Sequence, residues 1–231
     1  MLNNGLAVKQ KEISMKDRYK FIGPAYDFLS SIYGGESIHN CKRAMLDTEH
    51  VKPGDKILIA GVGHGKDAIK AAELGADVTV VDLSETMLRK FKEAVDKHPQ
   101  DLDIRQIHSD ILKFEEFEQY DMVIANFFLN VFSEDLMLEI LRHLMKCAKP
   151  KAKVVIGDFE YPSGNIINRV LQKAYWYGAV SIFWVVANNA MHNIYNYPKI
   201  MEELGLTIKD KKQFRFLGLN CYWSIMGQKQ A

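Results

Sequence analysis

Short apolar runs alternate with amphipathic stretches from residue 56 onward. Runs rich in β-branched residues predict strands, and apolar residues at helical spacing predict helices between them. The predicted strands are 56–60, 77–81, 103–107, 120–125 and 153–158. The predicted helices are 66–74, 84–97 and 134–148. Strands that alternate with helices indicate βαβ units and therefore a parallel sheet.

The two ends of the chain depart from this alternation. Residues 206–214 and 221–227 are strand-like and are joined by a short connection, which predicts a closing antiparallel hairpin. Amphipathic stretches at 17–32 and 36–50 predict helices that cover one mouth of the sheet. The predicted fold class is α/β: a doubly wound, mostly parallel seven-stranded sheet with a C-terminal antiparallel hairpin and a helical N-terminal cover.

Composition excludes several classes of protein. The formal net charge is +1, so no global positive field favours nucleic acid as a partner. The three cysteines are far apart and form no CxxC pair, which argues against a disulfide framework or a zinc site. We predict no metal. The lysine-rich N-terminus is unlike a secretory signal, and no run of about 20 apolar residues would span a membrane. We therefore expect a cytoplasmic protein.

The first predicted strand leads directly into a glycine loop. Glycine stands at Gly61, Gly63 and Gly65, where the absence of a Cβ atom lets the backbone turn sharply and approach a ligand. The following helix would point its N-terminal amides at that ligand. Asp82 ends the second strand, 21 residues after Gly61, where a carboxylate can accept both ribose hydroxyl hydrogens. The pattern predicts a nucleoside-containing cofactor.

The spacing of the glycines narrows the choice of cofactor. Dinucleotide sites use G-x-G-x-x-G, and Lys66 stands where the third glycine of that pattern would be. The chain also contains no G-x-x-x-x-G-K-[ST] segment, which excludes a P-loop. A G-x-G-x-G loop suits a smaller ligand with a charged amino-acid tail.

Five motifs, in order, resemble those of the class I S-adenosylmethionine-dependent methyltransferases. They are the glycine loop 61–65, the ribose motif 81–88, the acidic motif 109–111, the fourth strand 120–126 and the turn 149–153. The resemblance implies S-adenosylmethionine as the cofactor. The cofactor contacts that it implies are Gly61, Gly63, Gly65, Asp82, Leu83, Met87, Asp110, Ile111, Asn126 and Tyr26.

Single positions refine this resemblance. Asp110 matches the acidic residue that meets the adenine amino group in the family, and Asn126 follows the fourth strand. Tyr26 begins a segment similar to one that closes over the cofactor in ubiquinone/menaquinone-biosynthesis C-methyltransferases; phospholipid N-methyltransferases belong to the same group of relatives. The chain departs from the family at Ile59, where an acidic residue usually receives the methionine ammonium group, and in the turn 149–153, which lacks the usual glycines. We expect carbonyl groups of Gly61 and Asn126 to accept from the ammonium instead.

An uncharged, aromatic-rich stretch at 174–198 predicts the substrate side. Such a lining favours an apolar or aromatic acceptor, for example a quinone precursor, a lipid or a secondary metabolite. The candidate substrate-pocket residues are Tyr175, Trp176, Phe183 and Tyr197. A buried core helix and a homodimer interface are alternative interpretations of the stretch. A further one is peripheral membrane contact through Trp176, Phe183 and Trp184, with Lys209, Lys211, Lys212 and Arg215 meeting anionic headgroups.

Methyl transfer requires a base only where the acceptor loses a proton. His192 is the preferred candidate, Tyr195 the second, and Asp158 ends the fifth strand nearby. The predicted function is methyl transfer from S-adenosylmethionine to a small acceptor. A non-catalytic S-adenosylmethionine-binding scaffold is the alternative that Ile59 allows, and an NAD(P)-dependent reductase is a weaker one.

We expect the whole chain, 1–231, to be one methyltransferase domain. Its expected parts are a helical N-terminal cover at 1–52, a cofactor-binding core at 53–160, a substrate-side helical insertion at 161–204 and the closing hairpin at 205–231.

Overall fold

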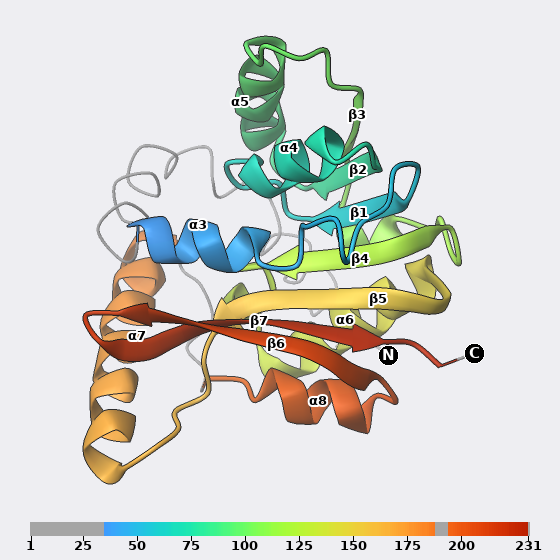
Figure 1. The fold of residues 1–231 in the computed structure, drawn as a ribbon. Helices are drawn as coiled ribbons and strands as arrows, with labels where there is room; N and C mark the ends of the chain where they lie inside the picture. The colour runs from blue at the N-terminus through green and yellow to red at the C-terminus, as the bar shows by residue number, and fades with distance from the viewer. Residues whose placement is uncertain (1–34, 188–193, 231) are drawn as a thin grey trace, which may run out of the picture.

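The computed structural model describes residues 35–187 and 194–230 of the chain, and side chains are described outside 179–193 (Figure 1). The helices are α3 (Gly35–Arg43), α4 (Lys66–Glu73), α5 (Glu85–Asp96), α6 (Glu134–Cys147), α7 (Ile166–Ala187) and α8 (Tyr197–Glu203). The strands are β1 (Lys56–Ala60), β2 (Asp77–Asp82), β3 (Ile104–His108), β4 (Tyr120–Asn126), β5 (Ala148–Phe159), β6 (Thr207–Phe216) and β7 (Leu219–Gln228). Two short 3₁₀ helices are η2 (Ile111–Lys113) and η3 (Leu129–Val131).

All seven strands form one sheet in the order β3-β2-β1-β4-β5-β7-β6. The strands β1 to β5 pair in parallel, and β7 runs antiparallel to both β5 and β6. The order reverses at β1 and β4, where the chain leaves one side of the sheet for the other. In such sheets ligands bind beside the carboxyl ends of the strands at this reversal. The predicted fold class, including the closing hairpin, is confirmed.

Two apolar cores lie on opposite faces of the sheet. One face packs against α4 and α5, whose buried residues include Ala68, Ala71 and Phe91. The other face packs against α6, whose buried side chains recur at helical spacing, and against α8. Helices on both faces explain why the central strands are apolar on both sides.

The helix α7 stands at one end of the sheet. In Figure 1 it lies beside the left-hand end, toward which the arrows of β1 and β4 point. Its inner side contacts β7. The segment that follows the last parallel strand therefore stands beside the carboxyl ends of the parallel strands.

The helical N-terminal cover is shorter than predicted in the part that the structure describes. The stretch 36–50 was expected to be helical throughout, but α3 ends at Arg43. The Asp47 carboxylate accepts hydrogen bonds from the backbone N–H of Glu49 and of His50, which stabilises a turn in place of further helix. The stretch 17–32 lies outside the described residues.

Candidate functional site

The glycine loop between β1 and α4 is held in a left-handed backbone conformation. The φ angles are 77° at Gly61, 49° at Gly63 and 67° at Gly65. A Cβ atom at Gly65 would overlap the Phe91 ring, and one at Gly61 would lie 2.6 Å from the Phe128 ring. Gly61 and Gly65 are therefore needed for packing inside the protein.

Gly63 differs from the other two glycines because its exposed side is open. A Cβ atom built at Gly63 would lie 3.4 Å from Lys42 Nζ. Apart from the two chain neighbours, no other atom of the described residues would lie within 4 Å of it. The backbone at Gly63 can thus be approached closely by a ligand.

Asp82 stands at the carboxyl end of β2 and is tied to the glycine loop. Its Oδ2 accepts a hydrogen bond of 2.8 Å from the backbone N–H of Val62, and its Oδ1 accepts one of 2.7 Å from Ser84. A carboxylate has about four lone-pair positions, which is more than these two bonds occupy. The side chain that was predicted to bind ribose also fixes the loop in place.

Two other predicted cofactor contacts, Met87 and Leu83, lie beside Asp82. Met87 is buried in the first turn of α5, which Ser84 caps by accepting from the Met87 N–H. The backbone carbonyl of Leu83 lies 3.0 Å from Nε2 of His108. These residues form the edge of the site at the ends of β2 and β3.

Asp110 begins η2, next to buried Ile111. Its Oδ1 accepts a hydrogen bond of 3.0 Å from the Leu112 N–H. The adenine contact that the family resemblance implies for Asp110 stays a prediction, since this cap is an independent reason for an aspartate here.

Asn126 ends β4 and joins three parts of the site. Its Nδ2 donates to the Lys42 carbonyl and to Asp67 Oδ2, each at 2.9 Å, and so links the end of α3 to the first turn of α4. Its Oδ1 is buried without a hydrogen-bond partner in the structure and lies against Gly157.

Ile59, at the position where the family usually has an acid, is fully buried in the apolar core. The buried Asp67 is a carboxylate on the helix that follows the loop.

Cationic side chains gather in front of the loop. Lys66 Nζ lies 3.4 Å from His39 Nε2, and the rings of His39 and His64 are 6.4 Å apart. Burial first, and then the charges of Lys66 and Lys42, lower the pKa of His39. Lys42 Nζ also lies 5.7 Å from the centre of the Phe127 ring. This positive region suits an anionic group, and the sequence analysis missed Lys42 because it precedes the first strand and belongs to no motif.

Asp158, near the carboxyl end of β5, is fully buried. Its Oδ1 accepts from Asn130 Nδ2 at 2.9 Å and from the Phe159 N–H at 2.7 Å, and its Oδ2 accepts from the Tyr197 hydroxyl at 2.8 Å. Burial raises the pKa of Asp158 to about 7, although these donors and the nearby charge of Lys42 lower it. A carboxyl group with this pKa can exchange a proton near neutral pH.

An aromatic cluster adjoins Asp158. We call it the Phe159 cluster, and its members are Phe127, Phe159, Tyr175, Trp176 and Tyr222. Ring centres lie 4.7 Å apart between Phe159 and Trp176 and 5.3 Å apart between Phe159 and Tyr222. The Tyr175 and Tyr222 hydroxyls are hydrogen-bonded to each other. Strands β5 and β7, helix α7 and the residue that follows β4 contribute to this cluster.

The predicted substrate-pocket residues have different environments. Tyr175 and Trp176 belong to the Phe159 cluster, and Tyr197 is bonded to Asp158. Trp176 is only 2% exposed, which contradicts its predicted place in a lipid interface. Phe183 lies in α7, within the part whose side chains are not described.

The candidate bases and Tyr26 complete the predicted site residues. Tyr195 is buried, and its hydroxyl donates to the Phe132 carbonyl at 2.9 Å. Burial raises the pKa of this hydroxyl, so it keeps its proton. His192 and Tyr26 lie outside the described residues. The catalytic roles of His192 and Tyr195 stay predictions.

Sequence comparisons point to one class of protein. Residues 57–151 match the family described as a methyltransferase domain. A demethylmenaquinone methyltransferase of Renibacterium salmoninarum is 25% identical over 142 residues, which are 62% of this chain and 57% of that protein. A ubiquinone/menaquinone biosynthesis C-methyltransferase of Teredinibacter turnerae is 26% identical over 160 residues, which are 67% of this chain and 61% of that protein. The chain thus spans less than two thirds of the length of each relative.

Solved structures are similar over more of the chain. A 1,6-didemethyltoxoflavin-N1-methyltransferase of Burkholderia thailandensis, with bound 1,6-didemethyltoxoflavin and S-adenosylhomocysteine, matches with a TM-score of 0.69 at 15% identity. The match covers 96% of this chain and 90% of that one. A magnesium protoporphyrin IX methyltransferase of Synechocystis matches with a TM-score of 0.66 at 18% identity, over 92% of this chain and 98% of that one. At these identities the likeness shows the fold.

The strand order, the glycine loop and the carboxylate at the end of β2 define a Rossmann-like methyltransferase fold. Together with the match of residues 57–151 to a methyltransferase domain, they support a class I S-adenosylmethionine-dependent methyltransferase. The cofactor of this class is S-adenosylmethionine.

Proposed function

We propose that the chain transfers a methyl group from S-adenosylmethionine to a small aromatic or lipophilic acceptor. The observation that supports this most is the position of Asp158 and the Phe159 cluster. Both lie at the carboxyl ends of the strands, the edge of the sheet that also carries the glycine loop.

The residues of the loop fit S-adenosylmethionine. Asp82 has acceptor capacity for the ribose hydroxyls, and the open backbone at Gly63 allows close approach. Lys42, near Gly63, would hold the carboxylate of the methionine tail. The ammonium group would meet carbonyl groups of the loop, because Ile59 offers it no charge.

Aromatic rings support an acceptor with a ring system. Flat acceptors pack well against aromatic side chains, which bury much apolar area with few rotatable bonds. The Renibacterium and Teredinibacter relatives are named for quinone biosynthesis, with transfer to carbon in the second, and the Burkholderia enzyme is named for transfer to nitrogen. We therefore propose an acceptor with a ring system and leave open whether carbon or nitrogen receives the methyl group.

The chain's own residues would perform three tasks during transfer. When bound, S-adenosylmethionine supplies a methyl group already activated by a positively charged sulfur. The Phe159 cluster would align the acceptor and exclude water. Asp158 would take the proton that the acceptor releases as the new bond to the methyl carbon forms, and Tyr197 and Asn130 would hold the carboxylate in place.

Calorimetry and a transfer assay test the function. We expect S-adenosylhomocysteine to bind with a dissociation constant on the order of 10 µM, within the usual range for enzyme ligands, and NADH not to bind. Labelled methyl from S-adenosylmethionine should then appear in at least one member of a panel of demethylated quinols, phenols and N-heterocycles. Absence of S-adenosylhomocysteine binding would overturn the proposal. Binding without transfer to any acceptor would favour the non-catalytic scaffold.

Lys42→Met is expected to weaken S-adenosylhomocysteine binding roughly tenfold, the effect of one lost charge-assisted hydrogen bond. The affinity for 5′-methylthioadenosine, which lacks the amino-acid tail, should change less than about twofold. Calorimetry with both ligands measures the difference.

Arg43→Met is the matched control for Lys42. It removes the same charge from the next residue, whose guanidinium lies near His39 and Asn40 at the surface of α3. An equal loss of affinity for both ligands in Lys42→Met would contradict a contact with the carboxylate.

A further inference from the structure

The outer face of α7 exposes an unusual amount of apolar surface. Six of the eight large hydrophobic side chains that the described part of the chain exposes lie between residues 161 and 177: Tyr161, Ile166, Ile167, Val170, Leu171 and Tyr177. Ile166 is 77% exposed and Ile167 is 69% exposed. Contiguous apolar surface of this kind marks an interaction site more often than scattered single residues do.

These residues share one face of the helix. Ile166, Ile167, Val170, Leu171 and Tyr177 recur at helical spacing, so their side chains form one stripe along α7. The opposite face is docked on the protein. There Gln172 Nε2 donates to the Asn220 carbonyl at 2.6 Å and Trp176 packs on Phe159. The inner face thus accounts for how α7 is attached.

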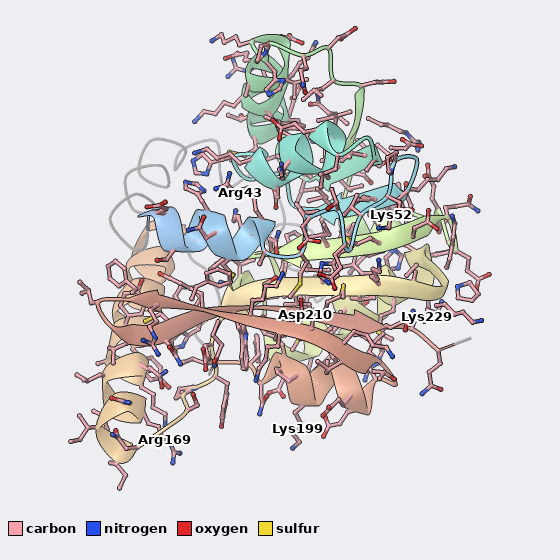
Figure 2. The ribbon with its side chains drawn as sticks, in the orientation of Figure 1. Arg43, Lys52, Arg169, Lys199, Asp210 and Lys229 are labelled. Carbon is pink, nitrogen blue, oxygen red and sulfur yellow. The ribbon has the colours of Figure 1, made fainter. Side chains whose placement is uncertain are left out.

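The charged residues of α7 itself are all positive. The sequence from residue 161 to residue 201 contains no Asp or Glu, whereas Arg169 and Lys173 are both exposed beside the stripe. Figure 2 shows Arg169 near the N-terminal end of α7. An apolar helix face whose own helix carries cations and no acidic residue fits a membrane surface with anionic headgroups.

We infer that α7 docks the protein on an anionic lipid surface, with its apolar stripe in the headgroup region. A second copy of the chain fits the stripe less well. A symmetric pair would bring Arg169 and Lys173 of both copies together, and the helix has no acidic residue to compensate them. Among the described residues no helix is long and apolar enough to cross a bilayer, so the docking would be peripheral.

The location of the stripe links this surface to the proposed function, on which this step rests. Trp176 and Tyr175 join the same helix to the Phe159 cluster. A lipophilic acceptor dissolved in the bilayer would therefore reach the aromatic residues along the helix that touches the lipid.

Two of the four cations that the sequence alone suggested are engaged by the protein itself. The Lys212 ammonium group donates to the Ala44 carbonyl at 2.8 Å and lies 3.4 Å from the Asp47 carboxylate, and Lys211 lies over the Trp223 ring. Lys212 is thus held by the body of the protein. Arg169 and Lys173 on α7 itself are the cations placed to meet headgroups.

Vesicle cosedimentation of the full chain tests the inference. The probes are vesicles of phosphatidylcholine alone and vesicles with roughly 30% phosphatidylglycerol, chosen because anionic lipid is the variable. We expect the chain to partition onto the anionic vesicles at least tenfold more strongly, and less so at high salt. Arg169→Gln with Lys173→Gln should lower that partition roughly 25-fold, at about fivefold for each cation.

A second variant tests the apolar part, and a matched control accompanies it. Ile167→Gln with Leu171→Gln should reduce vesicle binding at least tenfold. Phe117→Gln, a change at an exposed aromatic residue on another part of the surface, should leave it unchanged. Retained S-adenosylhomocysteine affinity checks that each variant is folded.

Three results would overturn the inference: no vesicle binding at millimolar lipid, equal binding of the α7 variants, or a dimer in sedimentation velocity that the α7 variants dissociate. Transfer to a detergent-solubilised acceptor without vesicle binding would remove the docking surface and leave the proposed function intact. Vesicle binding without any transfer would keep the docking surface and overturn the proposed function.

Discussion

Replacing Asp158 by asparagine is expected to lower the rate of methyl transfer by roughly 10²–10³-fold, the usual contribution of a positioned base. The affinity for S-adenosylhomocysteine should change less than about threefold, because the side chain keeps its size and no cofactor contact is proposed for it. Single-turnover transfer to the best acceptor of the panel measures the rate, and calorimetry measures the affinity.

The pH dependence separates a base from a packing residue. With the pKa of Asp158 at about 7, the unprotonated fraction rises between pH 6 and 8, so the wild-type rate should rise over this window and then level. The asparagine variant should lose this rise. A parallel pH profile in both proteins would contradict the role of Asp158 as the base.

The free energy of unfolding should fall as pH rises, whereas the transfer rate should increase. The pKa of Asp158 is about 7 in the folded state and near 3.8 when unfolded, so the folded state retains the proton between these values. This contribution to stability is fully present below pH 4 and is lost as pH rises through 7. The change corresponds to roughly 4 kcal/mol. Urea unfolding at pH 5 and pH 8 should therefore show a smaller decline for the asparagine variant than for the wild type.

Two companion variants identify the role of the neighbouring residues. His192→Gln removes the other candidate base, and retained turnover there together with loss in Asp158→Asn would assign the proton transfer to Asp158. Tyr197→Phe removes one donor to the carboxylate, so the pH profile should shift to higher pH with a smaller loss of rate. Loss of the pH-dependent limb in His192→Gln alone would instead favour His192.

The strands and the glycine loop were predictable because their signals are local. Apolar runs predicted both ends of β1 to β4 to within one residue, and the glycine spacing located the loop. The fifth strand was predicted to begin at residue 153, but β5 begins at Ala148 and includes the predicted turn 149–153. The reasons for the glycines were not local. Gly65 is required by the ring of Phe91, and Gly61 by that of Phe128, far along the chain. In the sequence, these contacts are visible only as glycine, because the rings leave no room for a side chain at these positions.

The network around Asp158 depends on tertiary contacts. Its partners Asn130 and Tyr197 come from η3 and α8, and Lys42 comes from α3, so no spacing within one element reveals them. Asp158 was visible in the sequence as the end of a strand, but its pKa follows from burial. Lys42 had no signal at all. The predicted length of α3 was wrong for a local reason, because the turn at Asp47 competes with continuation of the helix.

Asp82→Ala is expected to weaken S-adenosylhomocysteine binding by at least tenfold, and up to roughly 100-fold. Two charge-assisted hydrogen bonds to the ribose hydroxyls would be lost. The backbone N–H of Val62 and of Ser84 would also lose their acceptor, so the glycine loop becomes less ordered in the free protein. Both effects act against binding, and calorimetry measures their sum.

A matched control and a second ligand separate these two effects. Asp77→Ala removes the same group from the exposed start of β2, at the opposite end of the strand, and should leave affinity unchanged. A 2′-deoxyribose analogue of S-adenosylhomocysteine lacks one of the proposed hydroxyl donors, so Asp82→Ala should cost this analogue less affinity than it costs the parent ligand. An equal loss for both ligands would mean that Asp82 acts through the loop alone. Unchanged affinity for the parent ligand in a folded Asp82→Ala protein would mean that the ribose binds elsewhere. Among the described residues, Asp82 is the carboxylate that accepts from the Val62 N–H, so no second carboxylate stands at the glycine loop in the same way to replace it.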